Sequence, residues 1–266
     1  MSFTTIDIER REGIEIVTLN RPDALNTLDS KLVEELTDYF LGLHERYDVR
    51  VVIMRGAGRA FCAGLDLKGW ASDSEQSSRV HRGLKTQQRI ARIIKLMRSC
   101  PQPVVGLGHG AACGGGLSLL LACDVRYGAP SLRMNAAYIK VGLGGADIGS
   151  SYLLPRLVGM SVASELLLTG RFINAERALR ANLLSEIVEE DRLLDTGLAL
   201  AADMLATAPM GLRMTKDALN LNIDASSLEA AMAIEDRQQI MMATTADHGE
   251  AVAAFLEKRP PNYQDR

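Results

Sequence analysis

The sequence predicts an α/β fold that is followed by an all-helical C-terminal region. Strand-like and helix-like patterns alternate up to about residue 190, and from there to Lys258 the pattern is almost entirely helical. Alternating strands and helices are typical of an α/β core, whereas a separate run of helices forms an appendage. We therefore expect an α/β core over residues 1–195 and a helical region over residues 196–266. The Ala, Leu and Met residues of that region indicate packing between subunits.

The first elements follow from local patterns. Residues 3–8 and 14–19 each alternate apolar and polar side chains, and the Glu-Gly pair between them favours a hairpin. Asp29 or Ser30 stands where a helix N-cap is needed, so we expect a helix over residues 31–47.

A glycine-rich loop follows the next predicted strand. The apolar run over residues 49–54 predicts a short buried strand, and the segment GAGRAFCAGLDLKGW occupies residues 56–70. A loop directly after a strand is where α/β proteins place binding and catalytic groups. A plain surface connection is the alternative, because glycine-rich loops are common turns.

A basic helix is predicted over residues 79–98. Its cations recur at spacings of three and four residues, and apolar residues take much of the opposite side. A solvated face or a subunit contact is the ordinary interpretation, and attraction of phosphate groups is the alternative. The cations are Arg79, Arg82, Lys85, Arg89, Arg92, Lys95 and Arg98.

The segment PVVGLGHGAACGGGLSLLLACD, residues 103–124, leads from a β-branched run through three glycines into a leucine-rich helical run. Glycines at a helix start let a ligand or another backbone approach free N–H groups at the positive end of the helix dipole. Close strand–helix packing would explain the glycines equally well. The spacing of Gly106, Gly108 and Ala111 also fits a dinucleotide-binding turn, but its acidic residue, Asp124, precedes the next strand instead of following it.

The rest of the core is predicted to continue the alternation. We expect strands over residues 125–127 and 184–188, and helices over residues 161–168 and 174–180.

Composition excludes several classes of function. Of the 266 residues 47% are hydrophobic and 24% charged, and the formal net charge of −3 argues against bulk binding of nucleic acid or an anionic membrane. The four cysteines and four histidines show no metal-ligand spacing, so we expect buried reduced thiols and no metal. No apolar run approaches the length of a membrane span. The start MSFTTIDIER lacks signal-peptide features, so we expect a cytoplasmic protein.

Five stretches carry more specific information: LNRPDALNTLD at 19–29, AFCAGLDLK at 60–68, GGGLSLLLACDVR at 114–126, YLLPRLVG at 152–159 and AFLEKR at 254–259. In this order they resemble the enoyl-CoA hydratase/isomerase (crotonase) superfamily over nearly the whole chain. The resemblance implies a ClpP/crotonase-like spiral of ββα units with a C-terminal oligomerisation region. It also implies an acyl-CoA thioester as substrate, no separate cofactor, and a homotrimer or dimer of trimers.

In similar enzymes two backbone N–H groups stabilise the negative charge that gathers on the thioester oxygen of an enolate. By resemblance these donors are the amides of Leu65 and Gly115. Coenzyme A would contact the first loop and a terminal helix of a neighbouring subunit, although a core Phe and a solvated Lys are the alternative for that helix. The corresponding residues are Ala24, Ala63, Asp66, Leu67, Lys68, Phe255 and Lys258.

The chain departs from the family at the two glutamates with which hydratases hold and deprotonate water. The corresponding positions are Ser118 and Tyr138, neither of which is a base at neutral pH. Asp147 is the remaining candidate base because it resembles the aspartate of the family's isomerases, and capping a helix near Ser150 is its alternative role. His81 and Tyr138 are further candidate proton carriers.

Three functions are compatible with the resemblance. The first is hydration or isomerisation of unsaturated acyl-CoA thioesters. The second is another crotonase reaction, such as thioester hydrolysis, decarboxylation or carbon–carbon cleavage. The third is a binding protein that keeps the two loops without an acid–base pair, since the loops define how a thioester is held but not its reaction.

Overall fold

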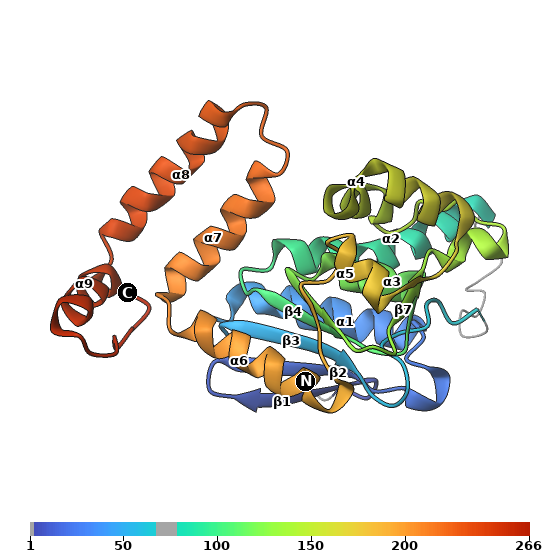
Figure 1. Cartoon of the computed structure of the whole chain (residues 1–266), viewed down its shortest axis with the longest axis horizontal. Coiled ribbons are helices and arrows are strands. Elements are labelled where there is room, and N and C mark those ends of the chain that lie inside the picture. Colours follow the sequence, from blue (N-terminus) through green and yellow to red (C-terminus); the bar gives the residue numbers. More distant parts are fainter. Residues whose placement is uncertain (1–2, 68–78) are drawn as a thin grey trace.

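The computed structural model describes residues 3–67 and 79–266 (Figure 1). Its central sheet has the strand order β1-β2-β3-β4-β6-β9, in which β1 and β2 form an antiparallel hairpin and the other neighbours are parallel. A smaller sheet has the order β5-β7-β8. The strands are β1 (Ile6–Arg11), β2 (Ile14–Leu19), β3 (Val51–Gly56), β4 (Val104–Gly108), β5 (Ala111–Cys113), β6 (Val125–Gly128), β7 (Arg133–Asn135), β8 (Ile173–Asn174) and β9 (Glu186–Ile187).

Helices cover both faces of the central sheet. On one face α1 and α2 join the core that contains Val52 and Met54, and on the other α6 joins the core that contains Val51 and Ile53. Successive residues of β3 thus point into opposite cores, which is why the strand is a continuous apolar run. The helices are α1 (Ser30–Gly42), α2 (Arg79–Ser99), α3 (Gly115–Ala122), α4 (Ser150–Thr169), α5 (Ala175–Arg180), α6 (Leu193–Leu205), α7 (Pro209–Asn222), α8 (Leu228–Ala243) and α9 (Ala246–Glu257), with 3-10 turns at Pro22–Ala24, Leu43–Glu45, Ala137–Val141 and Glu190–Arg192.

Several local predictions are confirmed. The N-terminal hairpin forms, although its first strand extends to Arg11. The Asp29 carboxylate caps α1 by accepting the N–H of Leu32 at 2.8 Å. This helix ends at Gly42, earlier than predicted, and a 3-10 turn takes over the next residues.

The helix predicted over residues 161–168 is longer at its N-terminus. α4 begins at Ser150, and Gly159 divides it with a φ of +77°, a conformation that glycine adopts readily. The helix predicted over residues 161–168 corresponds to the segment after this glycine, and the segment before it begins at Ser150, where the sequence analysis also expected a helix start.

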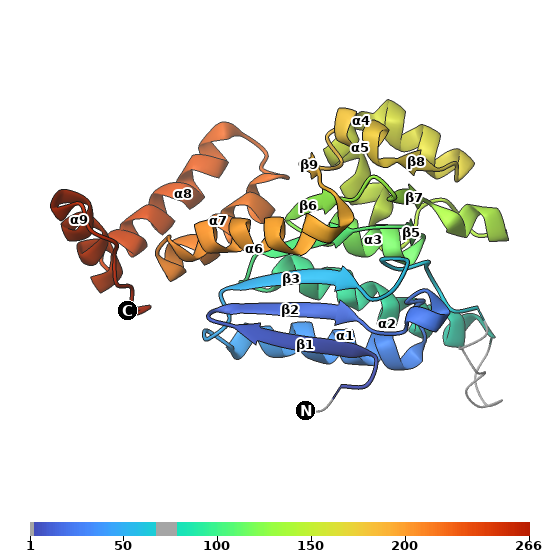
Figure 2. The same ribbon diagram turned by 60° about the horizontal axis from the view of Figure 1, so that its bottom comes forward.

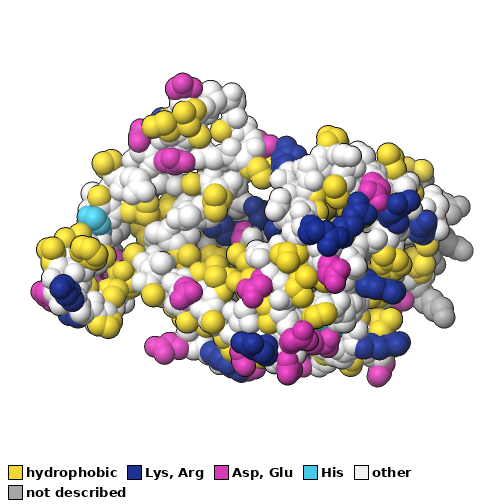
Figure 3. All heavy atoms as spheres, in the orientation of Figure 1, with side chains coloured by type: hydrophobic (Ala, Val, Ile, Leu, Met, Phe, Trp, Pro, Cys, Tyr) yellow, Lys and Arg dark blue, Asp and Glu magenta, His cyan; other side chains and the backbone are white. Residues whose placement is uncertain are grey.

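The helical C-terminal region extends away from the sheet (Figures 1 and 2). The expected boundary at residue 195 falls inside α6, which packs on the sheet. Hydrophobic side chains are exposed along α8 and α9 (Figure 3), among them Leu228, Ile240 and Phe255. Within the described residues no helix is long and apolar enough to cross a membrane.

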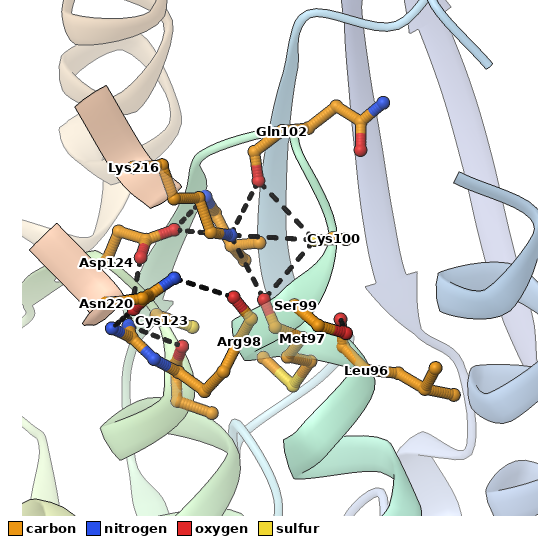
Figure 4. A network of polar contacts seen from close by, with 12 residues as sticks. Leu96, Met97, Arg98, Ser99, Cys100, Gln102, Cys123, Asp124, Lys216 and Asn220 are labelled. Atoms are coloured by element: carbon orange, nitrogen blue, oxygen red, sulfur yellow. Dashed lines mark hydrogen bonds and ion pairs between the residues drawn. The ribbon is translucent and has the colours of Figure 1, made fainter. Parts of the chain in front are cut away.

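A buried lysine joins α7 to the core (Figure 4). Lys216 is 5% exposed, and its Nζ donates to the carbonyl oxygens of Gln102 at 2.7 Å and Met97 at 3.0 Å. It also lies 2.9 Å from Oδ2 of Asp124, whose Oδ1 accepts a hydrogen bond from Arg98 at 2.9 Å. The cation thereby satisfies the Met97 carbonyl in the last turn of α2, which the helix leaves without a donor, and the Gln102 carbonyl in the segment that follows.

Candidate active site

The two glycine-rich segments meet although about fifty residues separate them. Cys62 and Ala112 form a parallel β-bridge, and the Cys113 N–H donates to the Cys62 carbonyl oxygen at 3.0 Å. A Cβ atom on Gly116 would lie 2.0 Å from that carbonyl oxygen, so only glycine permits the approach. The strand–helix packing that the sequence left open is therefore present, and it brings the first loop against the start of α3.

The amides of Leu65 and Gly115 lie on these adjacent segments. Gly64 carries a φ of +108°, and a Cβ atom placed on it would be 3.9 Å from the Gly115 nitrogen. The Gly64 carbonyl and the Asp66 N–H are both bonded to Leu28, so the Leu65 N–H, which alternates with them, points away from that partner. Among the described residues neither the Leu65 nor the Gly115 amide has an acceptor.

The start of α3 favours negative charge. Its N-cap is Gly114, with a φ of +49°, and no side chain caps the helix. The first turn contains no acidic residue that would compensate the helix dipole. A Cβ atom on Gly115 would lie 2.6 Å from Cδ1 of Leu28, so a side chain there would clash with Leu28. The arrangement can accept an anionic oxygen through main-chain donors that do not titrate.

Ser118 and Tyr138, the residues at the positions of the usual glutamates, are brought together behind this helix start. Tyr138 Cδ1 would be 3.4 Å from a Cβ atom on Gly114. Ser118 is 0% and Tyr138 6% exposed, and in the described part of the chain neither hydroxyl has a hydrogen-bond partner. Burial raises the pKa of the Tyr138 phenol, the nearby hydroxyls of Ser150 and Ser118 oppose that rise, and the Asp147 charge adds to it. Both hydroxyls are closed to solvent, so neither can take a proton from water in this conformation.

Asp147 keeps an accessible carboxylate beside the same cluster. Its Oδ1 accepts the side-chain amide of Gln87 and, at 2.8 Å, the backbone N–H of Ile148. Burial raises the pKa of Asp147, and these two hydrogen bonds act in the opposite direction. Ile148 Cδ1 would lie 3.7 Å from a Cβ atom on Gly115, which places the segment next to the free amide.

The alternative role of Asp147 as a helix cap is not what the structure shows. The N-cap of α4 is Gly149, and no side chain donates or accepts there. The Asp147 backbone N–H instead donates to Oγ of Ser150 at 3.0 Å. The carboxylate is thus free of a capping role.

The residues expected to hold coenzyme A are distributed over two distant places. The amides of Ala63 and Asp66 are occupied by the carbonyl oxygens of Leu25 and Leu28, each at 3.0 Å. Leu67 is 68% exposed at the rim of the loop, Ala24 ends the 3-10 turn at Pro22–Ala24, and Lys68 lies outside the described residues. The Asp66 carboxylate is paired with Arg21 at 3.1 Å.

Phe255 and Lys258 are remote from this site within one chain. Both views place α9 at the end of the molecule opposite to the first turn of α2 (Figures 1 and 2). Phe255 is 84% exposed, and Lys258 follows α9 with a φ of +53°. His81, in the first turn of α2, has an exposed side chain.

The structure also bears on the dinucleotide interpretation and on the state of the cysteines. Asp124 is held by Arg98, by Lys216 and by the Val104 N–H, so it is not available to a nucleotide ribose, and the dinucleotide interpretation is excluded. All four cysteines are buried free thiols, as expected. Within the described residues no group of three His, Cys, Asp or Glu side chains could hold a metal. Sequence analysis missed Gln87 and Ser150, which carry no local signal and matter only through their contacts with Asp147 and Tyr138.

Comparisons with known proteins show the family to which the chain belongs. The model of the enoyl-CoA hydratase/isomerase family matches residues 9–266. A probable enoyl-CoA hydratase of Mycobacterium leprae is 39% identical over 97% of this chain and 88% of its own length. An (E)-benzylidenesuccinyl-CoA hydratase of Thauera aromatica is 32% identical over 97% of this chain and 98% of its own.

Solved structures of similar proteins superpose on nearly the whole chain. A putative enoyl-CoA hydratase of Streptomyces coelicolor superposes with a TM-score of 0.93 at 35% identity, covering 100% of this chain and 96% of that one. An enoyl-CoA hydratase of Bacillus anthracis gives a TM-score of 0.92 at 30% identity, covering 99% and 100%. The expected crotonase fold is confirmed, and the chain belongs to the enoyl-CoA hydratase/isomerase family.

Proposed function

We propose that this enzyme acts on unsaturated acyl-CoA thioesters by stabilising an enolate at the amides of Leu65 and Gly115. Two observations support the proposal: the β-bridge between Cys62 and Ala112 holds the two glycine-rich segments together, and neither amide has an acceptor among the described residues. Losing one such donor costs about 3–4 kcal/mol of transition-state stabilisation, so both amides are needed for full activity.

We assign Asp147 as the base. In double-bond migration its carboxylate removes a proton from a carbon of the acyl chain, and the electron pair passes to the thioester oxygen as an enolate. Return of the same proton to another carbon completes the reaction, with no net change in atoms or charge. One accessible carboxylate is sufficient for this sequence.

Hydration requires more of the site, because a water molecule must be held and deprotonated as it adds to the double bond. The hydroxyls of Ser118 and Tyr138 are closed to solvent and are not bases at neutral pH. The geometry therefore favours isomerisation, whereas the similar proteins named above are hydratases or probable hydratases. In a hydratase of this sequence Asp147 would have to activate the water alone.

The same proposal includes the substrate handle and the assembly. Coenzyme A would lie along the first loop, and the reaction would need no separate cofactor. The exposed Phe255 of α9 and Lys258, which follows the helix, would reach coenzyme A from a neighbouring chain. The exposed hydrophobic side chains of α8 and α9 support a homotrimer or dimer of trimers. The residues at the handle are Ala24, Ala63, Asp66, Leu67 and Lys68.

The test supplies the protein with 2-enoyl-CoA and 3-enoyl-CoA thioesters and follows the conjugated enoyl chromophore. Isomerisation of a 3-enoyl substrate increases the chromophore, and hydration of a 2-enoyl substrate removes it, so product analysis distinguishes the two. Asp147→Asn is expected to abolish turnover while retaining acyl-CoA binding. Tight binding without turnover of any thioester would reject the enzymatic proposal and favour a binding protein.

A further inference from the structure

Gln87 connects α2 to the candidate base. Its side-chain Nε2 donates a hydrogen bond to Oδ1 of Asp147, sixty residues further along the chain. The same oxygen accepts the Ile148 backbone N–H at 2.8 Å. Across residues 3–67 and 79–266 no donor reaches Oδ2. The two carboxylate oxygens are therefore not equivalent, since Oδ1 is occupied and Oδ2 remains able to accept a proton.

This asymmetry suits a carboxylate that takes a proton from carbon and then returns it. Two donors on Oδ1 fix the plane of the carboxyl group, so that Oδ2 keeps one direction during the reaction. A neutral amide favours the charged carboxylate without pairing it with a cation, whereas an Arg or Lys would make it a weaker base. Gln87 also opposes the effect of burial, which raises the pKa of Asp147.

We propose that Gln87 is a positioning residue that holds Asp147 with Oδ2 directed at the acyl chain. This inference rests on the proposed role of Asp147 as the base. Gln87 touches no reacting atom and acts through the carboxylate alone. The position of α2 then decides how the base is oriented, which couples the basic helix to the chemistry at the start of α3.

The experiment compares three substitutions of Gln87 with a matched one at Gln88. Gln88 also lies exposed on α2, and its side chain makes no hydrogen bond within the described part of the chain. Gln87→Leu removes the donor, Gln87→Glu adds a carboxylate beside Asp147, and Gln87→Lys supplies a donor with a positive charge. The readouts are the pH dependence of kcat/KM, thermal unfolding, and the pH titration of the Asp147 carboxyl carbon by NMR, which does not depend on turnover.

The three variants are expected to shift the acidic limb of the profile in a defined order. Gln87→Leu lowers kcat/KM about 10-fold and moves the limb to higher pH, because a hydrogen bond to the charged form is lost. Gln87→Glu moves it higher still, and Gln87→Lys moves it below the wild type. Tyr138 is the titratable group that faces Asp147 from the 3-10 turn at Ala137–Val141, so the same order is expected in a Tyr138→Phe background.

The positioning role is overturned if the Asp147 titration and the acidic limb stay at the wild-type pH in all three variants. A fall in rate alone does not support the role, because lost packing can lower the rate without shifting either pH value. Gln88→Leu is expected to change neither. Asp147→Asn separates this inference from the proposed function. Full activity in Asp147→Asn refutes the base itself, whereas an inactive Asp147→Asn with unshifted Gln87 profiles refutes only the role of Gln87.

Discussion

Replacing Gly116 with alanine tests whether the contact between the two loops is needed for activity. The new Cβ would lie 2.0 Å from the Cys62 carbonyl oxygen and 2.8 Å from its carbon. Because both neighbours are backbone atoms, the first loop must move by about 1.4 Å to bring the Cβ–oxygen distance from 2.0 Å to the 3.4 Å of an ordinary contact. That movement disturbs the hydrogen bond from the Cys113 N–H to the Cys62 carbonyl, which is 3.0 Å long.

The magnitudes follow from this geometry. Overpacking costs about 1–3 kcal/mol, and the higher helix propensity of alanine returns at most about 1 kcal/mol of it. The melting temperature of a domain of this size falls by about 2–4 °C for each kcal/mol lost. Because the Leu65 amide moves with the loop, and a misplacement of about 1 Å already costs about 100-fold, this displacement is expected to lower kcat at least about 100-fold.

The assay combines thermal unfolding with enoyl-CoA turnover. Gly42→Ala is the matched control, because a Cβ atom there has nothing within 4 Å and the backbone is already helical. The control is expected to keep both the rate and the melting temperature or to raise the latter slightly. A Gly116→Ala protein with wild-type rate and melting temperature would refute the claim that these segments are held at their closest approach.

Three further predictions concern the donors and the stability of the fold. Leu65→Ala is expected to keep kcat within a few-fold, because the donor is the backbone N–H. Leu65→Pro removes this N–H and is expected to lower kcat about 100- to 1,000-fold. Equal losses in the two variants would contradict a main-chain donor. Lys216→Met is expected to lower the free energy of unfolding, measured in urea, by about 3–5 kcal/mol. The substitution leaves the Asp124 carboxylate and two carbonyl groups without the buried cation. A loss below about 1 kcal/mol would show that water replaces the ammonium group. Burial alone would raise the pKa of Glu35, but hydrogen bonds from Thr5 and Thr4 outweigh it and lower the pKa from 4.5 to about 2. The ionised carboxylate thereby contributes about 3 kcal/mol to the free energy of unfolding; this contribution is fully present above pH 4.5 and is lost as the pH falls toward 2. Glu35→Gln should therefore lower the free energy of unfolding at pH 6 and have little effect at pH 2. An effect that is independent of pH would contradict this reasoning.

The sequence by itself determined the features that depend on neighbouring residues. The alternation of residues 14–19 and the capping carboxylate of Asp29 act over a few positions, and both have the predicted structure. The motifs around Gly64 and Gly115 identified the family for the same reason, because each is a short run whose residue types are required locally. A pattern of this kind is present in the chain before it folds.

The tertiary structure alone decided which distant groups meet. The approach of Leu65 to Gly115 and the bond between Gln87 and Asp147 join segments fifty and sixty residues apart, and no periodicity in either segment specifies its partner. The same is true of the enclosure of Ser118, which depends on how α3 packs behind the loop. Such contacts are set by the order of strands in the sheet and by packing against it, because these bring together groups that local sequence does not relate.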